Sequence, residues 1–220
     1  MSELDFHIEH AAAIPFAAMP TLGFRLRIVN ASGQKIHSTL LRCQILIEAT
    51  KRRYSAKEQQ HLRDLFGEPE QWSKTLRSML WTHVSAVVPA FESEQAIELL
   101  IPCSFDFNVA ATKFFYGLDS GDISLLFQFS GSVFYESEDG SMLVAPISWD
   151  KEARFRLQVN TWRKMMDLYY PNTAWLCLRR DIFDRIYQYK VQNGIPTIEK
   201  AMEQLFASAL DIERKETVGL

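Results

Sequence analysis

Hydrophobic and polar residues alternate along most of the first 160 positions, which is the pattern of half-buried β-strands. In Leu4–His10, for example, every second residue is a large apolar one. Turn residues such as Gly, Asp and Ser separate many of these segments. The further predicted strands are Leu22–Ile28, Leu41–Ile47, Met79–Val88, Ala96–Ile101, Cys103–Val109, Ile123–Tyr135, Met142–Ile147 and Ala153–Val159. Eight to nine strands at this spacing favour an antiparallel β-sandwich, and we expect the segments on either side of Asn30–Gly33 to form a hairpin.

A short helical insertion interrupts the strands near residues 55–74. Ser55 and Glu58 have the spacing of a capping box, in which each side chain accepts from the other residue's backbone N–H. An apolar stripe follows, and Gly67 stands where a helix commonly ends. Pro69 is expected to open a further turn that runs through Trp72.

The apolar period changes to that of helices near residue 160. Residues 162, 165, 166 and 169 form one helical face, Asp181 is expected to cap a second helix, and Thr197 a third. The predicted fold class is therefore α+β: a sandwich over residues 1–160 with two to three C-terminal helices over residues 161–210. We expect these helices to pack on the sandwich as part of the same domain, and the polar tail 211–220 to be frayed.

Composition excludes several classes of protein. The 220 residues are 47% hydrophobic and 23% charged, which are the values of a folded domain. A net charge of −3 gives no general footprint for nucleic acid, and no uncharged stretch reaches the roughly 20 residues of a membrane span. The three cysteines form no metal-binding or disulfide pattern, and Met1–His10 lacks a basic signal region, so we expect a cytoplasmic protein without nucleic-acid or membrane partners.

None of the common catalytic signatures occurs, so we assign no catalytic, cofactor-binding or metal-binding residue. Three residues remain candidates to test. His83 lies on a strand face shared with Trp81, where a hydrogen-bonded structural histidine is the favoured interpretation. Asp106 would suit acid–base chemistry only beside a second titratable group. Cys177 is the one cysteine followed closely by positive charge, although a small buried hydrophobic residue is the favoured interpretation.

Two further features suggest binding. Met165, Met166, Tyr169 and Tyr170 are candidate interaction residues because Met and Tyr suit adaptable contacts, although core packing explains the same pattern better. Four phenylalanines would line an apolar pocket between the sheets if one exists: Phe105, Phe107, Phe127 and Phe129. The basic run Lys51–Arg53 is interpreted as a solvated turn.

Several short strings together resemble an uncharacterised bacterial domain-of-unknown-function family that is associated with gene clusters for uptake nickel–iron hydrogenases. They are Leu41–Ile45, Leu65–Pro69, Leu80–Val84, Phe129–Phe134, Ser148–Glu152 and Tyr170–Asn172. The similarity runs from about Pro20 to Phe206 and implies an accessory, assembly or maturation role beside the enzyme. The family supplies no functional residues to carry over.

The leading hypothesis is accordingly a non-enzymatic protein that binds another protein, such as a hydrogenase subunit or maturation factor. A binder of an apolar small molecule or lipid inside the sandwich is the alternative, and an enzyme with an unrecognised site the second alternative. An edge strand that the helices leave uncovered would also be able to pair with a second copy of the chain.

Overall fold

The structure, a computed structural model, describes residues 3–104, 106, 108–136 and 140–218. It divides into two compact units, Met1–Thr173 and Ala174–Leu220. The boundary therefore follows the first helix after the strands rather than preceding it.

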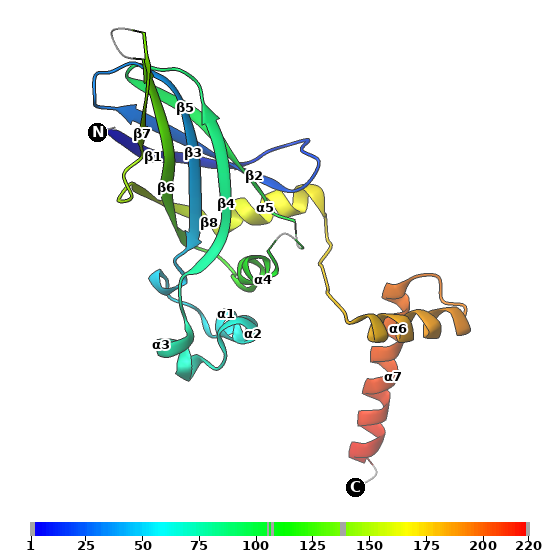
Figure 1. Cartoon of the computed structure of the whole chain (residues 1–220). Coiled ribbons are helices and arrows are strands. Elements are labelled where there is room, and N and C mark those ends of the chain that lie inside the picture. The colour runs from blue at the N-terminus through cyan, green and yellow to red at the C-terminus, as the bar shows by residue number, and fades with distance from the viewer. Residues whose placement is uncertain (1–2, 105, 107, 137–139, 219–220) are drawn as a thin grey trace. The chain divides into compact units, whose positions relative to one another are not determined.

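Among the residues that the structure describes, the first unit contains eight strands in two antiparallel sheets, together with the helices described below (Figure 1). The first sheet has the order β1-β2-β5, and the second runs β4-β3-β6-β7 with β8 also paired to β6. The bounds are β1 (Leu4–Ala13), β2 (Thr21–Asn30), β3 (Ile36–Ile47), β4 (Met79–Val88), β5 (Glu94–Pro102), β6 (Asp122–Glu136), β7 (Met142–Pro146) and β8 (Glu152–Gln158). The α+β fold class with about eight strands is confirmed.

Strand β6 is the organising element of the second sheet because three other strands pair with it. Along one edge it pairs with β3 over most of its length. Its other edge is shared, since β8 pairs with the half that begins at Asp122 and β7 with the half that ends at Glu136.

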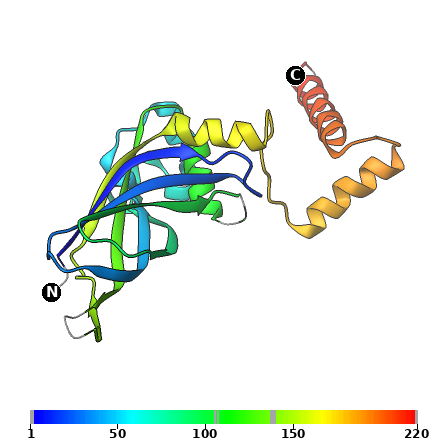
Figure 2. The same cartoon turned by 90° about the horizontal axis from the view of Figure 1, so that it is seen from above.

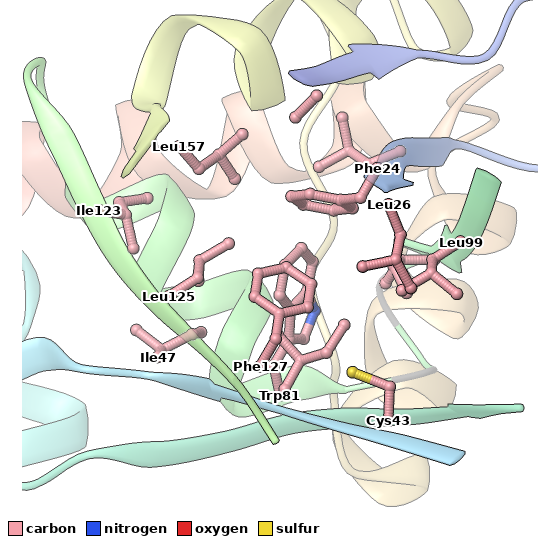
Figure 3. Packing of buried hydrophobic residues seen from close by; sticks show 14 of the residues in the cluster. Phe24, Leu26, Cys43, Ile47, Trp81, Leu99, Ile123, Leu125, Phe127 and Leu157 are labelled. Atoms are coloured by element: carbon pink, nitrogen blue, oxygen red, sulfur yellow. The ribbon is translucent and has the colours of Figure 1, made fainter. Parts of the chain in front are cut away.

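The core lies between the two sheets, where inward-facing aromatic and aliphatic side chains meet (Figure 3). Phe24 of β2 is central to it: its ring lies 5.3 Å from that of Phe127 and 6.1 Å from that of Trp81, both in edge-on contact. Such aromatic pairs add to the free energy gained by burial itself. The apolar residues that alternate along the strands are therefore the ones that fill this core.

Two strand predictions are wrong. β2 and β3 do not form a hairpin, because β2 pairs with β1 and β5 whereas β3 pairs with β4 and β6. The predicted strand Cys103–Val109 is also not found among its described residues, and helix α4 (Val109–Gly117) begins where it was expected to end. Asn108 starts this helix, since its side chain accepts a hydrogen bond from Ala111 N at 2.9 Å.

The helical insertion connects β3 to β4 (Figure 1). It contains η1 (Ala49–Lys51), α1 (Ala56–His61), α2 (Arg63–Phe66), η2 (Pro69–Gln71) and α3 (Trp72–Thr75). The Ser55–Glu58 capping box is confirmed in both directions. After the strands, α5 (Val159–Tyr169) packs alongside β1 and β2 (Figure 2).

The second unit is a pair of helices, α6 (Arg180–Gln192) and α7 (Ile198–Val218), that contact each other. Thr197 begins α7, since its hydroxyl accepts from Lys200 N, whereas α6 begins at Arg180 with no side-chain cap. The backbone of α7 is helical through Val218, into the segment predicted to be frayed. Packing of these helices on the sheets stays a prediction. Within the described part of the chain, no helix has both the length and the apolar character to cross a bilayer.

Candidate functional site

His83 lies on the outer face of β4, with its side chain exposed. A β-bulge at Trp81 explains this position: Ile45 pairs with Thr82 and the next residue of β3 pairs with Leu80, so Trp81 is the extra residue. Trp81 therefore points into the core, and the face it was expected to share with His83 is interrupted. His83 Nε2 lies 3.2 Å from Gln44 Oε1 on the neighbouring strand. This contact is of the kind expected for a hydrogen-bonded structural histidine.

Asp106 and Cys177 do not come together with His83. Asp106 is exposed in the turn before α4, and Cys177 is exposed in the second unit. The interpretation of Cys177 as a buried residue is therefore wrong. Among the described residues, neither forms a hydrogen bond or ion pair with a second titratable group, and no group of three or more His, Cys, Asp and Glu side chains is placed to hold a metal ion. The three candidates thus give no assembled site.

The other two cysteines are buried in the core, as the sequence indicates. Burial raises the pKa of Cys43 to about 12 and that of Cys103 to about 12. A thiol with such a pKa is protonated at neutral pH and is a poor nucleophile.

Within the basic run Lys51–Arg53, Lys51 and Arg53 are exposed, as a solvated turn predicts, but Arg52 is used inside the protein. Arg52 Nη2 lies 2.6 Å from Glu58 Oε1, and both side chains are almost buried. Glu58 Oε1 also accepts from Asp119 N at 3.0 Å, and Arg52 Nη2 donates to Ser120 O at 3.2 Å. This ion pair therefore joins the helical insertion to the turn before β6.

The predicted interaction residues on α5 are only in part accessible. Met165 and Met166 are 0% and 3% exposed, so they belong to the core of the first unit and not to an open surface. Tyr169 is half-buried, and its hydroxyl donates to Ile14 O and accepts from Ala17 N. Tyr170 is half-buried as well. Met165 and Met166 are therefore core residues, as the alternative interpretation predicted, because α5 lies against β1 and β2.

The sandwich interior is filled around the two described phenylalanines of the predicted pocket. Phe129 stacks on Phe6 with ring centroids 4.3 Å apart, and Phe127 meets Phe24. Phe105 and Phe107 lie outside the described residues. Close packing at Phe127 and Phe129 leaves no room for a ligand beside them.

A surface pocket of about 300 Å³ lies between α4 and α5. Trp162 and Met166 of α5 and Tyr170, the residue that follows the helix, form much of it. Tyr116 at the end of α4 adds a further wall, and its ring meets that of Trp162 edge to face at 4.8 Å. The pocket is thus aromatic on several sides.

Two charged residues, Arg163 and Asp167, also line this pocket. Arg163 Nη2 donates to Leu118 O and lies 4.0 Å from Asp119 Oδ1, so its charge is engaged at the end of α4. Burial raises the pKa of Tyr116, and the charge of Asp167 raises it further. The negative charge of Asp167 therefore acts on the hydroxyl group of Tyr116 across the pocket.

Sequence reasoning found part of this pocket. Met166 and Tyr170 were among the predicted interaction residues, but Tyr116 and Asp167 were not. Tyr116 was missed because α4 itself was not predicted. The signal was present, since Asn108 precedes a run with helix-forming alanines, although adjacent phenylalanines in that run resemble a strand.

Comparison with known proteins supplies a family. Residues 1–214 match the model described as a family of unknown function, DUF6084. The chain belongs to this family. The match confirms the resemblance to a domain-of-unknown-function family over nearly the whole chain, whereas the association of DUF6084 with hydrogenase gene clusters stays a prediction. No curated protein matches the sequence.

Solved structures that resemble this chain are distant. The CARDB domain of the PF1109 protein from Pyrococcus furiosus is 10% identical with a TM-score of 0.28, and the alignment covers 71% of this chain and 91% of that one. β-Glucosidase 3B from Thermotoga neapolitana is 13% identical with a TM-score of 0.27, covering 71% of this chain and 17% of the glucosidase. Similarities of this size support no conclusion about function.

Proposed function

We propose that this protein is a non-enzymatic accessory protein that binds another protein, and that the partner is a nickel–iron hydrogenase subunit or maturation factor in the cytoplasm. The nature of the partner rests on the family resemblance. The binding function rests on one observation, the apolar surface of the second unit.

The second unit buries little of its apolar surface. Over its residues whose side chains are described, 174–210, only Ile195 and Ala201 are fully buried. Large side chains on both helices and on the segment before them are exposed: Trp175, Leu176, Phe183, Tyr187, Val191, Leu205, Phe206 and Leu210. Two helices cannot enclose a core of their own, because each has apolar residues on more than the side that faces the other.

The arrangement of these residues suits an apolar partner surface. Phe183, Tyr187 and Val191 lie four residues apart and form a stripe along α6. An amphipathic helix of this kind binds by laying its stripe into a hydrophobic groove, with every fourth side chain as an anchor. Phe206, which is 64% exposed on α7, is the largest apolar group of that helix left open to solvent. We therefore infer that α6 and α7 dock against an apolar groove of the partner, in place of the sheets of the first unit on which the sequence pattern led us to expect them.

The test is co-purification of the tagged full chain with hydrogenase subunits and maturation factors produced in the same cells. Phe206→Glu introduces a charge into the apolar surface, and Gln204→Glu adds the same charge two residues away as the matched control. Because buried aromatic anchors dominate interface energies, we expect recovery of the hydrogenase component to fall at least about tenfold for Phe206→Glu and to be retained for Gln204→Glu.

Three outcomes would overturn the proposal. Recovery of no hydrogenase component at physiological salt removes the partner. Equal recovery with Phe206→Glu removes the surface. A dimer of the pure wild-type chain in light scattering that Phe206→Glu dissociates would assign this surface to self-association instead.

A further inference from the structure

The pocket between α4 and α5 has the size for one side chain rather than for a cofactor. Its volume of about 300 Å³ is at the lower limit of ordinary small-molecule sites. Its floor is apolar, since Trp162 is 1% and Met166 3% exposed. A flexible thioether floor of this kind accommodates the aliphatic stem of a long side chain.

The walls of the pocket favour a positive charge at the end of that stem. Aromatic ring faces attract cations, and Tyr116 at the end of α4 and Tyr170 just after α5 contribute such rings, whereas the buried ring of Trp162 is stacked on Phe115. Asp167 adds a full negative charge, and no ion pair involves this carboxylate within the described ranges of the chain. The one cation in the pocket wall, Arg163, is held by Leu118 O and Asp119. An incoming cation would therefore meet an unneutralised carboxylate together with aromatic walls.

We propose that this pocket binds the guanidinium group of an arginine side chain, which, if the proposed function holds, belongs to the protein partner. A guanidinium group is planar and stacks on aromatic rings, and it donates two parallel hydrogen bonds to a carboxylate. In this site Asp167 accepts those bonds, the tyrosine rings cover the planar faces, and Met166 contacts the stem. An ammonium group would use the charge of Asp167 but would gain less from the flat walls.

The test measures binding of a single side chain to the pure full-length protein, so that it does not depend on any partner. N-acetyl-arginine amide is titrated into ¹⁵N-labelled protein, with N-acetyl-citrulline amide as the uncharged analogue of the same shape. We expect saturable shifts of the Trp162 indole and the Asp167 amide with the arginine compound and none with citrulline. N-acetyl-lysine amide should bind more weakly than the arginine compound.

Asp167→Asn removes the charge and keeps the shape of the side chain, and we expect it to raise the dissociation constant about tenfold. Glu70→Gln is the matched control, because Glu70 is an exposed acid of the same unit outside this pocket, and binding should be unchanged. Tyr116→Leu should weaken binding without a loss of charge. Thermal melting of each variant shows that it is folded.

Equal shifts with citrulline, tighter binding of lysine, or unchanged binding by Asp167→Asn would overturn the inference. These outcomes are separate from those of the proposed function. Loss of partner capture by Phe206→Glu together with failure of arginine binding would leave the second unit as the binding surface and remove only the pocket.

Discussion

Gly131 marks a close approach of two strands in the second sheet. It lies on β6 with a φ of +139°, and a Cβ atom placed there would come within 1.9 Å of Leu40 O on β3. Just beyond it, β7 begins to pair with β6 at Ser132. The absence of a side chain at Gly131 therefore lets β6 lie against β3 at this residue.

We expect Gly131→Ala to lower the free energy of unfolding by at least about 3 kcal/mol, because the backbone of β3 has to move away. Urea unfolding followed by circular dichroism measures it. Gly33→Ala is the control: its φ is also positive, at +72°, but nothing lies within 4 Å of the added atom. It should cost only about 1 to 2 kcal/mol. Equal losses for both variants would show that backbone conformation, and not crowding against Leu40, requires the glycine.

Glu48 is a second residue whose environment has a measurable consequence. Burial alone would raise its pKa, but hydrogen bonds from Lys51 Nζ and Ser124 Oγ, with the charges of Lys51 and Arg154, outweigh burial and hold the pKa below its ordinary value of 4.5. A depressed pKa in the folded state stabilises the protein above the unfolded-state pKa, and this stability is lost as the pH falls through the folded value.

The unfolding free energy of the wild type should therefore exceed that of Glu48→Gln at pH 6 to 7, and the difference should shrink below about pH 4.5. Chemical denaturation at a series of pH values measures this. The exposed Glu152→Gln serves as the comparison and should show a much smaller difference. A gap between wild type and Glu48→Gln that is constant down to pH 3 would contradict the assignment.

Among the elements, the strands were predicted best where alternation runs without interruption. β4 has the bounds that its pattern predicts, Met79–Val88, and β6 differs by a single residue at each end. Alternation states which side of a strand is buried, but not which sheet the strand joins, and this is why β2 and β3 were wrongly paired. It also fails at a bulge, so the outward turn of His83 was not predictable from its neighbours.

The candidate site was less predictable than the fold for the same reason. Met166 and Tyr170 could be grouped because they lie close together in sequence, on α5 and directly after it. Tyr116 reaches the same pocket from α4, and no local pattern relates residues so far apart in sequence. The partners of Arg52 were not predictable for the same reason, since the carbonyl oxygens of Ser120 and Asp122 are far from Arg52 in the sequence.

Strand β7 is an edge strand of the second sheet with an exposed apolar surface. It consists of five residues, none charged, and Met142, Leu143 and Val144 are each about half exposed. Within the described part of the second sheet it pairs with β6 alone. Exposed apolar edges without charges or bulges are the ones that pair with other strands. We propose that β7 pairs with β7 of a second copy at high concentration.

Val144→Lys places a charge on this edge and should raise the dimer dissociation constant about tenfold, with a change in melting temperature below about 2 °C, because Val144 is already exposed. Sedimentation equilibrium measures the dissociation constant. Leu100→Lys, on the outer strand β5 of the first sheet, is the matched control and should leave it unchanged. A monomeric wild type at millimolar concentration, or dissociation by Leu100→Lys alone, would contradict pairing through β7.

At the scale of the whole molecule, the sequence predicted the change from strands to helices but not the division into two units. No glycine- or serine-rich linker marks the boundary at Thr173, and the helical period continues on both sides of it. What separates the units is the number of contacts, which depends on the fold and not on local composition.

The division predicts where a protease acts first. The side chains of Pro171–Cys177 are exposed and belong to no helix or strand, and the first tryptic sites after them are Arg179 and Arg180. We expect brief trypsin treatment to release a stable fragment that ends at one of these arginines, because exposed, irregular backbone is cleaved before packed strands. Mass spectrometry identifies the fragment. The double variant Arg179→Gln, Arg180→Gln should abolish this early cut, and equally early cleavage within β1–β8 would contradict the division.

The position of β6 in the second sheet has a consequence for synthesis on the ribosome. β3 emerges long before the strand that pairs with it most extensively, and β6 itself waits for β7 and β8. Until then β3 pairs with β4 alone, and the backbone N–H and C=O groups along its other edge have no partner strand. A nascent chain halted before Asp122 should therefore be held by chaperones, and release from them should follow only when Gln158 has been translated.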